Sequence, residues 1–480
     1  MKKSIVVTNL FWRFAERCGA QLVQFIVSVI LARILMPEVY GTITLVLVFT
    51  RILQVFVDSG FGNALIQKKE ADDLDFSSVF YFNTVICVVI YFFMYCMAPY
   101  ISGFYGDASL IAIIRVLCLT IVVSGLKNVQ QAYVSRTLQF KKFFYATLIG
   151  TVISAIIGVG MALCGMGVWA LVAQNLTNLI IDTIVLWCTV KWKPKRIFSW
   201  QRLKELYSYG WKLFLSSLLD TGYNNLRQMI IGKLYSSADL AYYDKGKQFP
   251  NLIITNVNAS INSVLLPVMS KEQDNRENIK NMTRKAIKTS SYIMAPLMMG
   301  LAFTARPIVS LILTDKWLPC IPFLRIFCIT YMFYPIHTAN LNAIKALGRS
   351  DLFLKLEIIK KVIGLIILAV SMQYGVMAMA YSLLLGSLTG QIINSWPNRK
   401  LLRYGYLEQL KDIMPNILLA VLMGICVSFV NYLGFSHIIT LLIQVCLGTV
   451  IYIGASALLK LEIFLFLYES LKEILGKKKG

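Results

Sequence analysis

Fourteen apolar runs, each about 20 residues long, follow one another along this chain of 480 residues. An α-helix of that length matches the hydrocarbon thickness of a bilayer. Hydrophobic residues make up 57% of the sequence and charged residues 15%, against roughly 25% charged in soluble domains. The sequence therefore predicts an all-α polytopic membrane protein with about 14 transmembrane helices. The predicted spans lie near residues 8–34, 41–58, 77–98, 108–126, 143–163, 168–190, 207–232, 246–268, 288–312, 320–343, 352–373, 376–395, 412–433 and 438–459.

A six-helix plan occurs twice in the chain, about 200 residues apart. Three matched segments keep the same order at offsets of 210, 208 and 199 residues. They are Arg115–Thr120 with Arg325–Thr330, Pro99–Ser102 with Pro307–Ser310, and Trp12–Arg13 with Trp211–Lys212. Duplicated bundles of this kind build secondary transporters whose central site opens to either side of the membrane.

Six helices is an even number, so the two copies are expected to have the same orientation in the membrane, related by an axis along the membrane normal. We therefore predict a six-helix lobe over residues 1–200 and a second over residues 201–400, arranged as parallel repeats around a central cavity. Residues 401–480 would add two extra transmembrane helices and a basic cytoplasmic tail.

The cations sit mainly on alternate connections between the apolar runs. Of the 47 Lys and Arg residues, 34 fall in the termini and even-numbered connections, 5 in the odd-numbered connections and 8 within predicted helices. Positive charge accumulates on the cytoplasmic side of membrane proteins, so both termini are predicted to be cytoplasmic. The net charge of +23 then reflects topology, and no nucleic-acid partner is expected.

Eight cations lie inside the predicted helices, where each costs roughly 2.5–3.5 kcal/mol to insert. Six of them are predicted to bind the substrate, as a ladder of positive charge through the membrane, because Arg binds phosphate through its bidentate fork. These six are Arg13, Arg17, Arg51, Arg115, Arg227 and Arg325; the other two are Lys212 and Arg306. Polar residues spaced by three or four in helices one, two, seven and eight predict a water-filled, cationic cavity.

Acidic residues offer a different interpretation of the same cations. Glu16, Asp58 and Asp220 are possible ion-coupling residues, and together with Asp182 and Glu357 they could pair with the arginines as structural ion pairs. Five acids cannot neutralise eight cations, so some positive charge is expected to remain. No metal site or cofactor is expected, because the ten cysteines form no CxxC pair and the chain has two histidines.

Enzymatic motifs are absent from the sequence: there is no GxxxxGK[ST], HExxH or GxSxG. A transporter is therefore expected rather than an enzyme. A membrane glycosyltransferase or ligase remains the enzymatic alternative.

Several segments resemble the Wzx-type (WzxC-like) polysaccharide flippases of the multidrug/oligosaccharidyl-lipid/polysaccharide exporter superfamily. The likeness extends to about residue 400, and at one turn Ala241 stands where the family usually has Gly. The segments that carry it are Leu31–Gly41, Asp58–Lys68, Arg136–Phe140, Ile230–Lys233, Tyr242–Tyr243 and Ala346–Arg349.

This resemblance implies the exporter fold and a bacterial inner-membrane location. It implies that an undecaprenyl-diphosphate-linked oligosaccharide moves from the cytoplasmic to the periplasmic leaflet for surface polysaccharide synthesis. Membrane lipids, polysaccharide polymerase machinery and H⁺ or Na⁺ as a coupling ion are the implied partners, and a monomer is expected. In the resulting mechanism Arg13, Arg17 and Arg51 capture the diphosphate, and the remaining arginines hold it as the outer side opens. A lipid II flippase and a cation-coupled drug antiporter are the alternatives within the superfamily.

Overall fold

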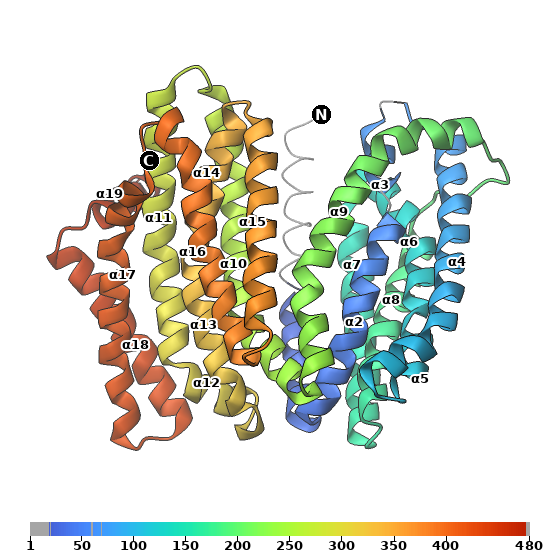
Figure 1. The fold of residues 1–480 in the computed structure, drawn as a ribbon, viewed down its shortest axis with the longest axis horizontal. Coiled ribbons are helices and arrows are strands. Elements are labelled where there is room, and N and C mark those ends of the chain that lie inside the picture. The colour runs from blue at the N-terminus through green and yellow to red at the C-terminus, as the bar shows by residue number, and fades with distance from the viewer. Residues whose placement is uncertain (1–18, 20, 59–60, 69, 477–480) are drawn as a thin grey trace. The chain divides into compact units, whose positions relative to one another are not determined.

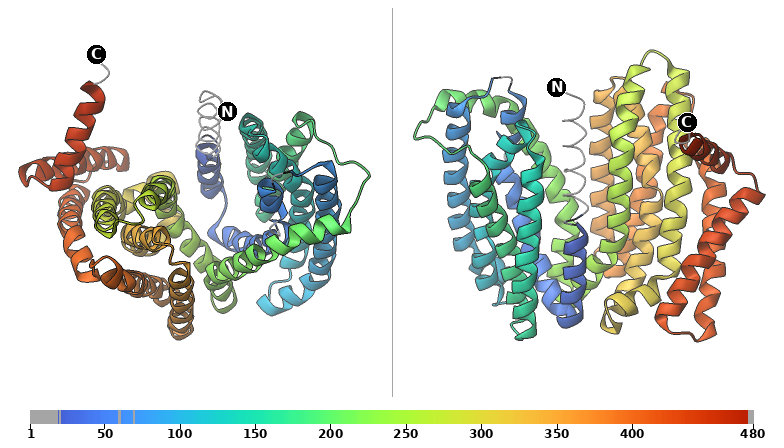
Figure 2. Two further views of the ribbon diagram at one scale, coloured as in Figure 1. Left: turned by 90° about the horizontal axis from the view of Figure 1, so that it is seen from above. Right: turned by 180° about the vertical axis from the view of Figure 1, so that it is seen from behind.

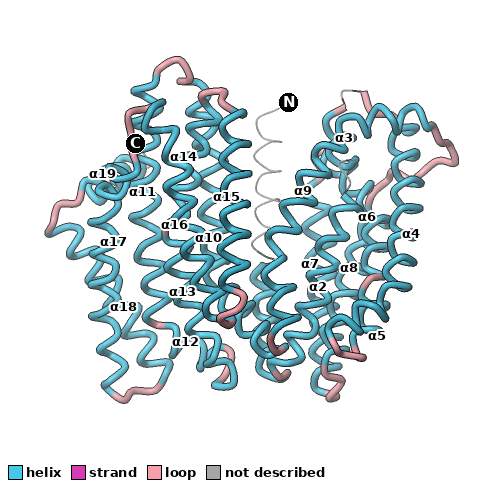
Figure 3. Tube along the Cα trace, viewed as in Figure 1, coloured by secondary structure: helices cyan, strands magenta, loops and turns pink. Residues whose placement is uncertain are grey.

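A computed structural model describes residue 19 and residues 21–58, 61–68 and 70–476. These described residues form helices joined by short turns, with no strand among them, which confirms the all-α prediction (Figure 3). By their internal contacts the residues divide into two compact units, Met1–Ala241 and Tyr242–Gly480. The helices of each unit carry the labels of Figure 1.

Unit 1 contains a helix at Gln21–Ile34 and then α2 to α9. Its most extensive helix contact joins α7 to α8, where glycines on α7 let the two backbones approach closely. Helix α9 packs on α2, α3 and α4 and so belongs to this unit. The bounds are α2 (Pro37–Asp58), α3 (Phe61–Gln67), α4 (Asp73–Tyr105), α5 (Leu110–Leu117), α6 (Leu119–Arg136), α7 (Phe140–Leu163), α8 (Val168–Thr189) and α9 (Trp200–Leu234).

Helix α4 shows why these segments begin and end where they do. Asp72 and Asp75 form a capping box, in which the Asp75 N–H donates to Asp72 at 2.9 Å and the Asp72 N–H donates to Asp75 at 3.2 Å. The Asp75 N–H also holds the pKa of the Asp72 carboxyl below its usual range. Gly106 ends the helix at φ 74°, a left-handed conformation that glycine adopts without strain. The 33 residues span about 50 Å, longer than the roughly 30 Å hydrocarbon core.

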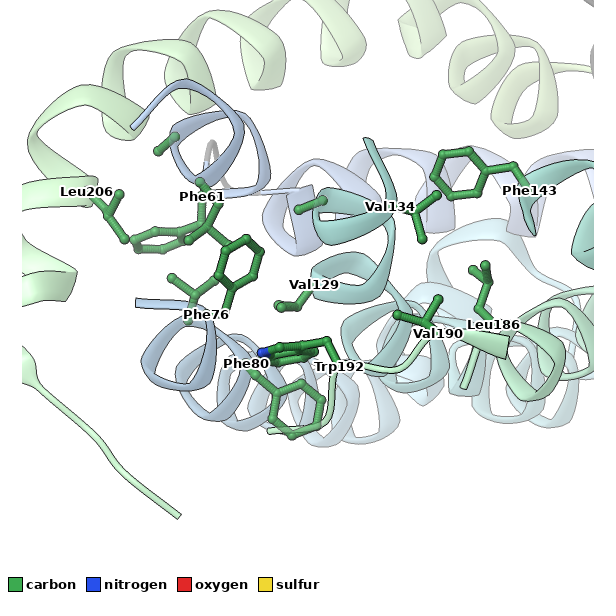
Figure 4. Close-up of a cluster of buried hydrophobic side chains, with 14 of the residues drawn as sticks. Phe61, Phe76, Phe80, Val129, Val134, Phe143, Leu186, Val190, Trp192 and Leu206 are labelled. Carbon is green, nitrogen blue, oxygen red and sulfur yellow. The ribbon is translucent and has the colours of Figure 1, made fainter. Parts of the chain in front are cut away.

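A cluster of buried aromatic and aliphatic side chains joins α3, α4, α6 and α9 in unit 1 (Figure 4). Trp192, from the segment between α8 and α9, packs on Phe76 of α4 with ring centroids 5.6 Å apart. Its indole N–H donates to Asp73 at 3.1 Å, and the backbone N–H of Lys195 donates to the Ser77 hydroxyl at 3.0 Å. These contacts fix the connecting segment, which leads into α9, against the start of α4.

Unit 2 begins within α10 and contains eleven further helical elements among its described residues. Helices α11 and α12 meet at a 66° bend beside Thr304. In the rear view of Figure 2, α17 and α18 run beside one another, and α17 also packs along α11. The bounds are α10 (Ser237–Lys271), α11 (Arg276–Phe303), α12 (Ala305–Ile312), η1 (Asp315–Cys320), α13 (Ile321–Met332), α14 (Tyr334–Ala346), α15 (Ser350–Ser371), α16 (Val376–Leu401), α17 (Tyr406–Ser428), η2 (Phe429–Leu433), α18 (His437–Leu458) and α19 (Glu462–Gly476).

The interior of unit 2 is crosslinked by amides. Asn340 of α14 accepts from Asn398 of α16 at 2.7 Å and from Gln409 of α17 at 3.0 Å, and all three side chains are fully buried. Burying an amide costs free energy unless it is hydrogen-bonded, so this network specifies how the three helices meet.

Ten described helices, or eleven if α11 and α12 form one bent span, are long and apolar enough to cross a membrane. The chain is thus a multi-pass membrane protein. Helices α9 and α15 also occupy predicted spans, but both carry charged residues along their length and are not among the ten. The total of fourteen spans stays a prediction. So does the division at residues 200 and 400, since the spatial contacts place one boundary, after Ala241.

Candidate polar site in unit 1

One face of α6 is polar along its whole length. Its polar side chains recur at steps of three or four, which places them on a single face of the helix. That face lines two neighbouring cavities within unit 1. The residues are Thr120, Ser124, Lys127, Asn128, Gln131 and Ser135.

The first cavity, called here the cationic cavity, has a volume of about 350 Å³ and lies between α2, α6 and α8. Arg51 and Gln54 line it from α2, Lys127 from α6 and Asn175 from α8. The Arg51 side chain is exposed in this cavity. Within the described ranges, no acidic side chain lies at ion-pair distance from Arg51. The Arg51 guanidinium is therefore available to a ligand.

The second cation of this cavity is neutralised inside the protein. Lys127 forms a close ion pair with Asp182 of α8, and their side chains are only 12% and 10% exposed. Gly150 of α7 lies against this part of α8, where an added Cβ would be 3.0 Å from the Asn178 carbonyl oxygen and 3.3 Å from the Asp182 nitrogen. Because Asp182 cancels the charge of Lys127, the net positive charge of the cavity comes from Arg51.

The second cavity, called here the hydroxyl–amide cavity, has a volume of about 450 Å³ and lies between α2, α3, α6 and α9. Asp58, at the end of α2, is its charged lining residue. Asn128 orients this end of α2 by donating to the Val57 carbonyl at 2.8 Å and to the Asp58 carboxylate at 3.3 Å. Asn128 and Gln131 line both cavities, so the two are adjoining parts of one polar surface.

Of the six arginines predicted to bind substrate, Arg51 is the one that lines these cavities; Arg13 and Arg17, like Glu16, lie outside the described residues. Arg115 lies over the Tyr95 ring at 4.0 Å and donates to the Tyr95 carbonyl at 3.4 Å. It lines neither cavity.

The remaining predicted residues lie elsewhere. Arg325, in unit 2, is exposed and donates to the Ala302 carbonyl at 3.2 Å. Arg227 is half-buried on α9. Asp220, also on α9, is exposed and accepts from Asn224 at 3.0 Å. The structure therefore does not bring these groups to the two cavities of unit 1.

Sequence reasoning missed the main contributor to this site. It ended the fourth span at residue 126 and assigned Lys127 and Arg136 to a cytoplasmic connection, but α6 continues to Arg136. The available signal was the polar spacing of three and four across that boundary. Two acids proposed as partners for arginines pair with lysines instead, Asp182 with Lys127 and Glu357 with Lys360 at 2.6 Å.

The arrangement of helices is that of a known class of membrane transporters. The chain is similar to the lipid II flippase MurJ in its inward closed conformation, with a TM-score of 0.72, 16% identity, and coverage of 93% of this chain and 98% of that one. It is also similar to an inward-facing multidrug resistance MATE family transporter of the MOP superfamily, with a TM-score of 0.61, 13% identity, and coverage of 83% and 95%. At such identities the likeness shows the fold alone.

The sequence narrows the class to a family. Residues 30–322 match the family described as polysaccharide biosynthesis protein, and the chain belongs to it. TuaB, a teichuronic acid biosynthesis protein of Bacillus subtilis (strain 168), is 23% identical over 382 residues, which cover 78% of each chain. WzxC, a lipopolysaccharide biosynthesis protein of Escherichia coli (strain K12), is 23% identical over 385 residues, covering 78% of this chain and 76% of that one. The resemblance drawn from the sequence is confirmed.

Proposed function

We propose that this protein is a flippase that moves an undecaprenyl-diphosphate-linked oligosaccharide from the cytoplasmic to the periplasmic leaflet for surface polysaccharide synthesis. Membership of the polysaccharide biosynthesis family and the flippase-like fold support transport of a glycan carrier. The proposal places the protein in the bacterial inner membrane with both termini in the cytoplasm, as the distribution of its cations predicts. It acts as a monomer, and H⁺ or Na⁺ is its candidate coupling ion.

One observation carries the proposal: Arg51 is exposed to the cationic cavity while the neighbouring Lys127 is already paired with Asp182. A cation in apolar sequence with no acidic partner among the described residues favours an anionic ligand. The planar guanidinium of Arg51 can bind two phosphate oxygens at once, a geometry that suits a diphosphate.

The proposed mechanism is alternating access between the two leaflets. Arg51 captures the diphosphate from the cytoplasmic side, together with Arg13 and Arg17. Rearrangement of the helices then exposes the ligand to the periplasm, where Arg115, Arg227 and Arg325 form the outer steps of the ladder. With the cell interior negative, an outgoing anion gains about 2.3 kcal/mol per charge for each 100 mV.

Substitution of Arg51 tests this function. A deletion strain carrying Arg51→Ala should lose surface polysaccharide and accumulate lipid-linked oligosaccharide in the inner leaflet, while the wild-type gene restores display. Arg196→Ala is the matched control, because Arg196 is an exposed arginine in the α8–α9 connection and lines neither cavity.

Membrane levels of both variants must equal those of the wild type. Normal display with Arg51→Ala would remove Arg51 from the mechanism. If deletion of the gene leaves display intact and changes resistance to cationic drugs, the antiporter alternative replaces the flippase.

A further inference from the structure

The hydroxyl–amide cavity differs chemically from the cationic cavity beside it. Its described lining residues include no Lys or Arg; one carboxylate, Asp58, is joined by side-chain hydroxyls and amides. Ser217 and Thr221 supply hydroxyls from α9, and Asn63 and Asn128 supply amides from α3 and α6. These groups offer both donors and acceptors, the combination that recognises a ligand with many hydroxyl groups.

Aromatic surface is present in the same lining. Phe214 of α9 lines the cavity and is held by an edge-on contact with Phe56 of α2, with ring centroids 5.0 Å apart. An aromatic ring offers a rigid apolar surface to the C–H groups of a sugar ring, while the hydroxyls of that sugar reach the polar groups around it. The volume of about 450 Å³ lies in the usual range for small-ligand pockets, roughly 300–1,000 Å³.

The position of the cavity fits a ligand that continues from the phosphate site. Arg51 and Asp58 are seven residues apart on α2, which puts them on the same helix face about 10 Å apart along the axis. The shared lining residues Asn128 and Gln131 join the two cavities. In the predicted topology α2 ends on the cytoplasmic side, so the hydroxyl–amide cavity lies beyond the phosphate site toward the cytoplasm, where the glycan is assembled.

We infer that the hydroxyl–amide cavity is a carbohydrate subsite that holds the sugars attached to the diphosphate, with Asp58 accepting hydrogen bonds from sugar hydroxyls. This inference rests on the proposed function, since it assumes that the diphosphate occupies the cationic cavity. It gives the site a selectivity: Asp58 favours neutral or amino sugars and repels a uronic acid at this position. A role for Asp58 in binding sugar also replaces the ion-coupling role considered from the sequence.

Three lipids separate the sugar contacts from the phosphate contacts: undecaprenyl diphosphate alone, the same lipid carrying one N-acetylhexosamine, and the same lipid carrying one hexuronic acid. Their affinities are measured for the purified full-length protein in detergent. Asp58→Asn should weaken binding of the N-acetylhexosamine lipid by about tenfold, the loss expected for one charge-assisted hydrogen bond. Phe214→Ala should weaken binding of the same lipid by roughly tenfold, because the apolar contact with the sugar ring is lost. Neither should change the affinity for undecaprenyl diphosphate alone. Asp58→Asn should also narrow the preference for the neutral sugar over the uronic acid.

Arg51→Ala and Glu70→Gln complete the set. Arg51→Ala should weaken the binding of all three lipids. Glu70→Gln should change none of the three affinities, because Glu70 is an exposed acid outside both cavities. Unfolding midpoints show that each variant is folded.

The carbohydrate assignment is wrong if Asp58→Asn and Phe214→Ala weaken the binding of all three lipids equally. It is also wrong if they weaken the binding of none of the lipids while Arg51→Ala weakens the binding of all. In the second case the proposed function survives. If the wild type binds none of the lipids and Arg51→Ala changes nothing, the proposed function itself fails. If Asp58→Asn leaves every affinity unchanged but alters the Na⁺ or pH dependence of surface display, Asp58 is an ion-coupling residue and the carbohydrate assignment is overturned.

Discussion

Two helix pairs, one in each unit, hold different polar contacts at positions that correspond under the predicted repeat. In unit 1 the ion pair of Lys127 and Asp182 joins α6 to α8. His337 of α14 comes 210 residues after Lys127, and Asn394 of α16 comes 212 residues after Asp182. The amide of Asn394 donates to Nδ1 of His337 at 3.0 Å, so the imidazole Nε2–H is left to donate to Ser387 at 3.3 Å.

Under the predicted repeat, the difference indicates how one helix plan can hold two kinds of polar contact. The unit 1 pair is fully charged and borders a cavity that also exposes Arg51. The unit 2 pair is built from an amide and an imidazole, next to a network in which Asn340, Asn398 and Gln409 are fully buried. Burying a charge costs little free energy only where water or an opposite charge contacts it, whereas hydrogen-bonded neutral amides can be fully buried. We therefore interpret this contact as structural in both units, and in unit 1 it lies beside the proposed ligand site.

Breaking the ion pair of Lys127 and Asp182 should have the largest effect on stability. Asp182→Ala leaves the Lys127 ammonium in a mostly buried place without its partner, and we expect a loss of roughly 3–5 kcal/mol in the free energy of unfolding. Thermal unfolding of the purified protein measures the change. Asn394→Ala, at the corresponding place in unit 2, removes only a neutral hydrogen bond and should cost less.

The double variant Lys127→Met with Asp182→Leu tests whether the loss comes from the isolated charge. It should recover most of the stability, because a buried ion pair can be replaced by apolar residues of similar volume at little cost. If the double variant is as unstable as Asp182→Ala, the contact does more than cancel two charges.

The sequence predicted the helical fold, and it paired Arg115 with Arg325 as corresponding residues of a repeat that stays a prediction. Both arginines donate through Nε to a carbonyl of the preceding long helix, at 3.4 Å to Tyr95 and 3.2 Å to Ala302. Their role as ligand-binding residues could not be judged from the sequence, because every residue has a carbonyl and nothing in the pattern tells which one an arginine reaches.

The cavities of unit 1 were harder to predict for a different reason. A membrane span is recognised in a sequence by its mean hydropathy. In a helix with one polar face, that mean falls where the polar residues are concentrated. Lys127 and Asn128 therefore marked the end of a span, although α6 continues through them. The surroundings of Arg51 and Asp58 depend on helices far apart in the sequence, and only the folded chain shows that α3 and α9 complete the lining around Asp58.

Substitutions of two glycines, one beside each of these contacts, should differ in their stability loss by an intermediate amount. At Gly150 an added Cβ meets backbone atoms of α8, at 3.0 Å from the Asn178 oxygen, and backbone cannot move without separating the helices. We expect Gly150→Ala to cost about 1–3 kcal/mol. At Gly390 the nearest atom belongs to the His337 side chain, at 3.2 Å.

A side chain can shift by a few tenths of an ångström, and alanine also favours a helix over glycine by roughly 1 kcal/mol, so Gly390→Ala should change stability by less than about 1 kcal/mol. Unfolding midpoints of the two variants in the same detergent measure the contrast. Equal losses of stability at both glycines would mean that the surroundings of the two contacts are equally rigid.

The smallest effect is expected when the ion pair of unit 1 is replaced by the type of pair found in unit 2. Lys127→His with Asp182→Asn gives unit 1 the pair found in unit 2 and leaves Arg51 in place. Because the native pair contributes no net charge, the cationic cavity keeps its charge, and stability should change by no more than roughly 1 kcal/mol. Surface polysaccharide display should continue. Loss of display in a variant that is folded and present at normal levels would show that Lys127 itself contacts the anion, with Asp182 holding it only until the ligand arrives.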